Sequence, residues 1–308
     1  PAKDGVKSNL NASIPDSKKK KKGQPPLPLM RGEKVLKRVL AKDQRELVSA
    51  YTTEAINFIE RHQEQPFFLY LPHSAVHFPL YPGKRFEGSS ENGLFGDWTQ
   101  EVDWSVGQVL ATVRRLGLDR RTFVLFTSDN GGQERHGADN GPLRGGKGST
   151  FEGGMRVPTI AWWPGKIPAG TQSDEITGMI DIMPTLAHLA AAKPPTDRKI
   201  DGANIWPLLS AEPDAESPHD SFLYYRGLHL QAVRLGDYKF MLSKKQLFNL
   251  RTDIGETVDV ADQHGDVIAQ IESIIAEVEN DLGVTEVGPG CRKLGHVDHP
   301  LPLIPFDE

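Results

Sequence analysis

The sequence is poor in cysteine, in long apolar runs and in excess positive charge. Its one cysteine, Cys291, excludes an internal disulfide framework, so cysteine usage leaves the redox compartment open. No apolar run approaches the ~20 residues of a membrane-spanning helix. A dedicated nucleic-acid binder needs a basic face, whereas this chain carries 36 Lys and Arg against 41 Asp and Glu. With 308 residues, it can form one large or two smaller globular domains.

The chain also lacks an initial methionine, because its first residue is Pro1. We therefore expect that it begins after processing or is a fragment, in which case any signal peptide lies upstream. Residues 1–30 are rich in Lys and Pro and are predicted to be a loop or linker. The lysine run Lys18–Lys22 within them favours a solvated loop over a site for an anionic partner.

From about residue 43, helical and strand-like patterns alternate along the chain. Apolar residues at helical spacing predict helices over 43–59, 102–116 and 181–192, the last with Asp181 as its N-cap. Short apolar runs predict buried strands at 66–72, 122–132 and 157–165, the second of which runs into a polar loop. This alternation predicts an α/β sheet covered by helices on both faces, with residues 31–210 forming the core.

The pattern changes after about residue 210, where a polar, proline-bearing connector begins. A hairpin turning at Gly236-Asp237, one further strand and an amphipathic helix over 267–282 are predicted there. Residues 211–308 are therefore expected to form a small α+β subdomain with an irregular tail from Gly283.

Polar groups follow two of the predicted strands, at the sheet edge where α/β proteins bind ligands. His73 and His77 follow the strand 66–72, and Asp129 and Asn130 follow the next one. Carboxylate and amide oxygens suit Ca²⁺ or Mg²⁺ rather than zinc. A turn before the glycines is the competing interpretation for Asp129 and Asn130, and a buried structural histidine is the competing one for His77.

A lysine flanked by glycines lies further along, in GPLRGGKGST. Gly141–Lys147 fit the start of a phosphate-binding loop, but Gly148 stands where that motif needs Ser or Thr, and no helix is predicted to follow. The interpretation as a nucleotide site is therefore rejected. Together with the oxygen donors and a histidine, Lys147 supplies the groups needed to bind and polarise an oxyanion ester.

The chain resembles the sulfatases, and within them the arylsulfatase A-like group. The resemblance covers about residues 43–260 and rests on PFFLYLPHSAVHFPLYPG, EVDWSVGQVLATVRRLGL, TFVLFTSDNGG, LRGGKGSTFEGGMRVPTIAWWPGKIPAG and DIMPTLAHLA, in this order and spacing. It implies an alkaline-phosphatase-like mixed sheet covered by helices on both faces and followed by a small α+β subdomain with an antiparallel sheet.

The resemblance also implies roles for particular residues. The pair Asp129–Asn130 matches two ligands of one Ca²⁺ ion, and Lys147 matches a lysine that contacts sulfate oxygens. His77 matches a histidine that contacts the sulfate and acts as a general acid, whereas His73 matches no catalytic position. Glu152 and Arg156 are expected to pack and fix the loop. The implied substrate is an aryl sulfate or a sulfated carbohydrate, and the implied location is periplasmic, secreted or lysosomal.

Several family features are missing from these residues. Members carry a Cys-x-Pro-x-Arg motif whose Cys becomes formylglycine, the nucleophile, and also a pair of Asp residues and a Lys-x-His pair. None occurs here, and Cys291 has neither the Pro nor the Arg that the motif requires. We therefore expect the chain to be the C-terminal part of a longer sulfatase and to be inactive when expressed alone.

Two alternatives remain at this point. A phosphatase or phosphodiesterase of the same fold would use two zinc ions, but Asn130 in place of a histidine favours one hard cation. A non-catalytic binding module for sulfated glycans could use Lys147 and the lysine run. The cluster Cys291, His296, Asp298 and His299 is interpreted as part of the irregular tail rather than a zinc site, because its spacing matches none.

Overall fold

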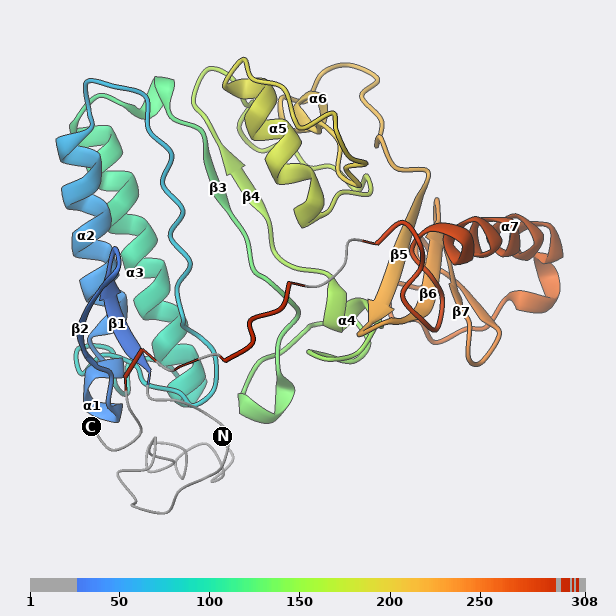
Figure 1. The fold of residues 1–308 in the computed structure, drawn as a ribbon, viewed down its shortest axis with the longest axis horizontal. Coiled ribbons are helices and arrows are strands. Elements are labelled where there is room, and N and C mark those ends of the chain that lie inside the picture. The colour runs from blue at the N-terminus through green and yellow to red at the C-terminus, as the bar shows by residue number, and fades with distance from the viewer. Residues whose placement is uncertain (1–26, 292–294, 300, 302, 305–308) are drawn as a thin grey trace. The chain divides into compact units, whose positions relative to one another are not determined.

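The structure, a computed structural model, describes residues 27–291, 295–299, 301, 303 and 304. The lysine run Lys18–Lys22 lies outside the described residues. The chain divides into two compact units, coloured by residue number in Figure 1. The first comprises Pro1–Leu118, Arg135–Ala138 and Leu294–Glu308, and the second Asp119–Glu134 and Asp139–Lys293.

The first unit begins with a hairpin of two short antiparallel strands, β1 (Pro28–Arg31) and β2 (Lys34–Arg38). Gly32 forms the turn with φ 58°, a left-handed conformation that glycine adopts without steric cost. The strand β1 starts in the last residues of the segment that was expected to be a loop. A single helical turn, α1 (Ala41–Gln44), leads into the main helices.

Two long helices, α2 (Leu47–Arg61) and α3 (Gly93–Arg115), pack side by side in this unit (Figure 1). A buried hydrogen bond of 2.6 Å joins the hydroxyl oxygens of Thr52 and Ser105 across them. The core beside these helices contains Val48, Leu80, Tyr81, Leu94 and Trp98. Both predicted helices are confirmed, and the second begins well before residue 102 because Leu94 and Trp98 continue its apolar face.

The prediction of a strand at residues 66–72 is wrong. These residues form neither helix nor strand, and the side chains of Phe68 and Tyr70 are 70% and 74% exposed. An apolar run becomes a buried strand only where neighbouring strands pair with its backbone and cover its faces. No strand among the described residues pairs with this segment.

The second unit contains the strands β3 (Val124–Phe126) and β4 (Ile160–Trp162), which pair antiparallel with Val124 opposite Trp162. Both predicted strands are confirmed, although each is short. Within the part of the chain that the structure describes, these two strands form a two-stranded sheet. The expected larger sheet with helices on both faces is therefore not found in these residues, since each strand has a single neighbour.

Short helices follow β4 in the chain: η4 (Met179–Asp181), α5 (Ile182–Leu189) and α6 (Trp206–Leu209). Asp181 is the N-cap residue of α5, as predicted, but its side chain makes no capping hydrogen bond to that helix. Its fully buried carboxylate instead accepts hydrogen bonds from the backbone N–H of Ala203 at 2.9 Å and from Nε2 of His219 at 2.6 Å. The same carboxylate also accepts a hydrogen bond at 2.7 Å from the N–H of Gly178, three residues before it in the chain.

A four-stranded antiparallel sheet in the order β5-β6-β7-β8 forms the rest of this unit. Its strands are Ser221–Arg226, His229–Leu235, Tyr238–Met241 and Gln246–Asn249. The predicted hairpin is confirmed, with Gly236 at φ 55° between β6 and β7, whereas β5 was not predicted. The helix α7 (Gly265–Asp281) packs on one face of the sheet (Figure 1).

The two faces of this sheet have different partners. Toward α7 lie Leu230, Val233, Phe240 and Leu247, which pack with Ile271 and Val278. Side chains alternate along a strand, and a bulge in the β5–β6 pairing shifts this alternation, so that Leu230 and Ala232 face opposite sides. The opposite face carries Tyr224, Ala232, Met241 and Phe248. These residues pack against Phe151 and Met155, which flank and end the one-turn helix α4 (Glu152–Met155). The sheet therefore supports the segment that bears Lys147.

The remaining short helical turns are η2 (Asp119–Arg121), η3 (Glu134–His136) and η5 (Ala261–Gln263). After Asp281 the described residues contain no helix or strand, in agreement with the irregular tail expected there. None of the helices seen in the described ranges has the length and apolar character needed to cross a bilayer.

Candidate active site

Asp129 and Asn130 directly follow the strand β3, as the sequence predicted. Asp129 is exposed and Asn130 is half-buried. Ser128 binds only the backbone of this pair, since its hydroxyl donates to the carbonyl oxygen of Asn130 at 3.3 Å. The side-chain oxygens of both residues have no hydrogen-bond or ion-pair partner among the described residues, and they can therefore bind a ligand.

Two oxygen donors fit part of a hard-cation site. Calcium takes about 6–8 oxygen ligands, and the described part of the chain contains no group of three or more His, Cys, Asp or Glu side chains that could hold a metal. Asp129 and Asn130 thus match the chemistry expected of calcium ligands but do not form a complete site by themselves.

The loop of Lys147 is joined to the Asp129–Gly132 loop through the backbone. The N–H of Lys147 donates to the carbonyl oxygen of Gly132 at 3.0 Å, and the N–H of Gly131 donates to that of Gly154, also at 3.0 Å. The side-chain amide of Asn140 accepts from the Gly132 N–H at 2.8 Å and donates to its carbonyl at 3.1 Å. The structure therefore joins the loop that carries Lys147 to the loop that carries the oxygen donors. Asn140 was missed because a single Asn before Gly resembles an ordinary turn.

Glycines make this close approach of three backbone segments possible. A Cβ atom on Gly131 would lie 1.9 Å from the carbonyl oxygen of Gly153, and one on Gly153 would lie 2.1 Å from that of Gly145. One on Gly146 would lie 2.6 Å from the Gly132 carbonyl oxygen. A side chain at any of these positions would push the loops apart. The glycine-rich composition of GPLRGGKGSTFEGG therefore serves packing of the two loops, not the cradling of a nucleotide.

Lys147 lies in the middle of its loop and is half-buried. Its ammonium group makes no hydrogen bond or ion pair with any residue in the described ranges. A cation held by its backbone and left without a counter-charge is suited to bind an anion.

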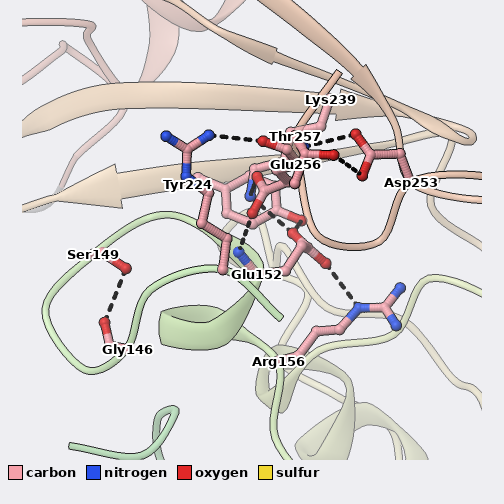
Figure 2. Close-up of polar contacts among 10 residues, drawn as sticks. Gly146, Ser149, Glu152, Arg156, Tyr224, Lys239, Asp253, Glu256 and Thr257 are labelled. Carbon is pink, nitrogen blue, oxygen red and sulfur yellow. Dashed lines mark hydrogen bonds and ion pairs between the residues drawn. The ribbon is translucent and has the colours of Figure 1, made fainter. Parts of the chain in front are cut away.

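Glu152 anchors the far end of this loop. Its side chain is fully buried, and its carboxylate accepts hydrogen bonds from Nε of Arg156 at 2.7 Å, Nζ of Lys239 at 2.8 Å and the Tyr224 hydroxyl at 3.1 Å (Figure 2). Burial alone would raise the pKa of the Glu152 carboxyl, but the charges of Lys239 and Arg156 outweigh it and hold this pKa below its usual value. These contacts agree with the loop-fixing role expected for Glu152 and Arg156.

His77 belongs to the first unit, where it is exposed. Its Nδ1 lies 2.6 Å from the carbonyl oxygen of Phe78. A carbonyl only accepts, so Nδ1 carries the proton and Nε2 is left to face a ligand. The ring of His136 stacks on that of Phe78 at 4.1 Å, and burial, with the positive charges of His77 and Arg135, lowers the pKa of His136. No motif marks His136 in the sequence.

His73 has a structural partner in the same unit. Its Nε2 lies 3.1 Å from the Ser105 hydroxyl, and burial lowers the pKa of its ring. In the tail, the thiol of Cys291 contacts the Leu282 carbonyl oxygen at 3.4 Å, while His296 and Asp298 form an exposed pair at 3.1 Å.

Comparison with known proteins first defines the class. The solved structure of a sulfatase from Pseudoalteromonas sp. is similar to this chain with a TM-score of 0.70 and 26% identity, over 80% of this chain and 55% of that one. The fold is thus the mixed α/β fold of the alkaline-phosphatase-like enzymes, with a four-stranded antiparallel sheet and a helix at its C-terminal end.

The family follows from the sequence models. A model described as Sulfatase matches residues 8–192, and one described as N-sulphoglucosamine sulphohydrolase, C-terminal, matches residues 146–281. The chain therefore belongs to the sulfatase family, whose members are sulfuric ester hydrolases, as the resemblance implied.

Curated relatives share much of this sequence. The N-acetylgalactosamine-6-sulfatase of Mus musculus is 45% identical over 199 residues, which are 63% of this chain and 38% of that protein. The steryl-sulfatase of Homo sapiens is 41% identical over 214 residues, which are 67% of this chain and 36% of that protein. The chain thus spans little more than a third of the length of the relatives it matches.

Proposed function

We propose that the chain contributes to the hydrolysis of sulfate monoesters by supplying part of a calcium site and part of a sulfate site. Family membership supports the reaction. The observation that carries the proposal for these residues is the hydrogen bond from the Lys147 N–H to the Gly132 carbonyl oxygen at 3.0 Å. It joins a lysine whose ammonium group has no partner among the described residues to the loop that presents Asp129 and Asn130.

In this proposal Asp129 and Asn130 hold Ca²⁺, the ion that the sulfatase family typically binds. When bound, the ion offsets negative charge on the sulfate oxygens. Further ligands must come from residues other than these two, because calcium needs about 6–8 oxygens. The exposed Asp129 carboxylate and the half-buried Asn130 amide are open to an incoming ion.

Lys147 binds the non-bridging oxygens of the sulfate and stabilises the charge that develops on them. With both ring nitrogens protonated, His77 gives its Nε2 proton to the departing alkoxide oxygen, while its Nδ1–H stays bound to the Phe78 carbonyl oxygen. The overall reaction converts a sulfate ester and water to an alcohol and sulfate. Because no Cys-x-Pro-x-Arg motif occurs in the 308 residues, the nucleophile is not supplied by this chain. We expect the chain alone to show no turnover.

The proposed substrate class is a sulfated carbohydrate. One similar protein, N-acetylgalactosamine-6-sulfatase, and one matching family model, N-sulphoglucosamine sulphohydrolase, C-terminal, carry names that state a sulfated amino sugar. Steryl-sulfatase, at a similar level of identity, makes a steroid sulfate the alternative. In the same proposal, residues 31–210 are part of the catalytic core, residues 211–308 are the small subdomain and tail, and the protein is exported.

A titration of the purified chain tests the site. Calcium chloride and then sodium sulfate are added while the backbone amides are followed by NMR. We expect Ca²⁺ to shift the amides of residues 128–132 and sulfate to shift those of residues 146–148. Loss of one charge-assisted contact costs about 1.5–3 kcal/mol, so Lys147→Ala should weaken sulfate binding by about tenfold or more.

Lys166→Ala is the matched control, because Lys166 is an exposed lysine of the same unit. Asp129→Ala should remove the calcium response, while Asp201→Ala, at another exposed carboxylate, should not. Equal sulfate affinity in Lys147→Ala and wild type would refute the role of Lys147. Measurable release of 4-nitrophenol from 4-nitrophenyl sulfate by the chain alone would refute the expected inactivity.

A further inference from the structure

A single buried residue, Glu256, holds both ends of the loop that carries Lys147. Its backbone carbonyl oxygen accepts a hydrogen bond from Nη1 of Arg144 at 2.7 Å, and its carboxylate Oε2 accepts one from the N–H of Glu152 at 2.7 Å. Lys147 lies between these two attachment points in the chain. Glu256 has no exposed surface, and more than a hundred residues separate it from either partner.

The carboxylate of Glu256 is itself held by Lys239 of β7. Nζ of this fully buried lysine lies 2.8 Å from Oε1 of Glu256 and 2.8 Å from Oε1 of Glu152 (Figure 2). Only the contact with Glu152 has hydrogen-bond geometry. Phe240 faces α7, so the alternation along β7 directs the neighbouring Lys239 to the opposite face, toward α4. The ammonium group also lies 4.2 Å from the ring centre of Tyr224.

The carboxyl groups of Glu152 and Glu256 have pKa values shifted in opposite directions. Burial raises the pKa of the Glu256 carboxyl, and Lys239 offsets only part of this. Glu152, with Arg156 as a second cation, keeps a lowered pKa. A buried ion pair is weak evidence for stability, since apolar residues of similar volume often stabilise as well. What apolar residues cannot provide is a directed acceptor for a particular N–H group.

We propose that Glu256, with Lys239 as its counter-ion, is a positioning residue for Lys147. It fixes the loop at Arg144 and Glu152, and the hydrogen bond from Lys147 to Gly132 then sets where the lysine stands relative to the Asp129–Gly132 loop. The proposal rests on the proposed function for the role of Lys147 in binding sulfate, whereas the hydrogen bonds that fix the loop do not depend on that role. According to this proposal, the C-terminal sheet, through Lys239 of β7, helps to set the position of Lys147 in the anion site.

Hydrogen exchange in the full chain tests the positioning directly. The amides of Lys147 and Gly153 donate to Gly132 and Arg144 at 3.0 and 2.9 Å and report the closed loop. In Glu256→Ala we expect both amides to exchange about tenfold faster or more, because local opening becomes easier, while the amides of β6 and β7 keep their protection. Sulfate affinity should fall in the same variant.

Glu256→Gln is the conservative variant. Its side-chain carbonyl oxygen can still accept from the Glu152 N–H, so we expect exchange at Lys147 and sulfate affinity within about threefold of wild type. If Glu256→Gln behaves as Glu256→Ala does, or if Glu256→Ala exchanges as wild type does, the proposal is overturned.

Glu256→Ala could instead unfold the subdomain, which loss of protection in β6 and β7 would reveal. Arg144→Leu then decides, because it removes the bond to the Glu256 carbonyl oxygen, together with the cation–π contact to the Phe151 ring, and leaves the buried carboxylates in place. Faster exchange at Lys147 with β6 unchanged supports the positioning, and unchanged exchange overturns it.

The two proposals fail in different ways. If Lys147→Ala abolishes sulfate binding and Glu256→Ala does not weaken it, the positioning fails and the proposed function stands. If exchange responds as expected but neither variant alters sulfate binding, the positioning stands and the sulfate role fails.

Discussion

Replacing Lys239 by methionine removes the one cation that Glu152 and Glu256 share. Glu152 keeps Arg156 and the Tyr224 hydroxyl, whereas the buried carboxylate of Glu256 is left with no ion-pair partner among the described residues. Methionine has a similar length and fills the space, so the main effect is electrostatic. Removing one partner of a buried ion pair costs about 3–5 kcal/mol. We expect the lower end of this range, because the raised pKa of Glu256 lets it neutralise by binding a proton.

The sign of the pH dependence follows from that proton. The pKa of Glu256 in the folded protein lies above its unfolded value, and loss of Lys239 raises it further. Folding is then favoured below the unfolded pKa, and this contribution is lost as the pH rises through the folded pKa. Lys239→Met should therefore be more destabilised at about pH 7 than at about pH 5, by up to ~1.4 kcal/mol per pH unit for one proton.

Urea-dependent hydrogen exchange of the β6 and β7 amides measures the unfolding free energy of the sheet itself. Relative to Lys239→Met, the double variant Lys239→Met/Glu256→Gln should recover about 1–3 kcal/mol of unfolding free energy, since it removes the buried carboxylate charge that has lost its partner. Lys166→Met controls for loss of an exposed lysine. A loss below about 0.5 kcal/mol at both pH values, or a loss that grows toward low pH, would refute the electrostatic reasoning.

Four further outcomes are expected. Burial raises the pKa of Glu101, so its contribution to the stability of the folded protein is present below the unfolded pKa and is lost as the pH rises through the folded pKa. Urea unfolding should therefore show that Glu101→Gln gains stability relative to wild type as the pH rises from about 4 to 7. Ile271→Ala should destabilise the sheet by about 2–5 kcal/mol, measured by exchange in β6, because its side chain is fully buried against that sheet. Gly153→Ala should weaken sulfate binding in the titration, because the new Cβ would meet the Gly145 carbonyl oxygen at 2.1 Å. Gly107→Ala, in open space on α3, should instead stabilise by up to about 1 kcal/mol.

Sequence periodicity predicted the helices α2, α3, α5 and α7 because each has one apolar face that its neighbours cover. It was wrong for residues 66–72, where an apolar run lacks a pairing partner, and it missed β5. A strand depends on hydrogen bonds to other segments, so local composition is a weaker guide to it than to a helix.

For the candidate site, the sequence pointed to residues with free functional groups. Asp129, Asn130, Lys147 and His77 stood out because oxygen donors, a lysine among glycines and a histidine each carry recognisable chemistry. Asn140 and Glu256 carried no such signal. Each acts by bonding to backbone groups of another loop segment, and nothing in the local sequence reveals which backbone group a side chain will meet.

Taken by itself, the sequence therefore determined the family, the amphipathic helices and the types of side chain available for a cation and an anion. Only the tertiary structure decided that Lys147 is joined to the Asp129–Gly132 loop, that the Asp181 side chain binds Ala203 and His219 instead of capping its helix, and that Lys239 lies buried between two carboxylates. The physical reason is that periodicity and composition are local properties, whereas hydrogen bonds and ion pairs in a low-dielectric interior depend on which distant segments folding brings within about 3 Å of each other.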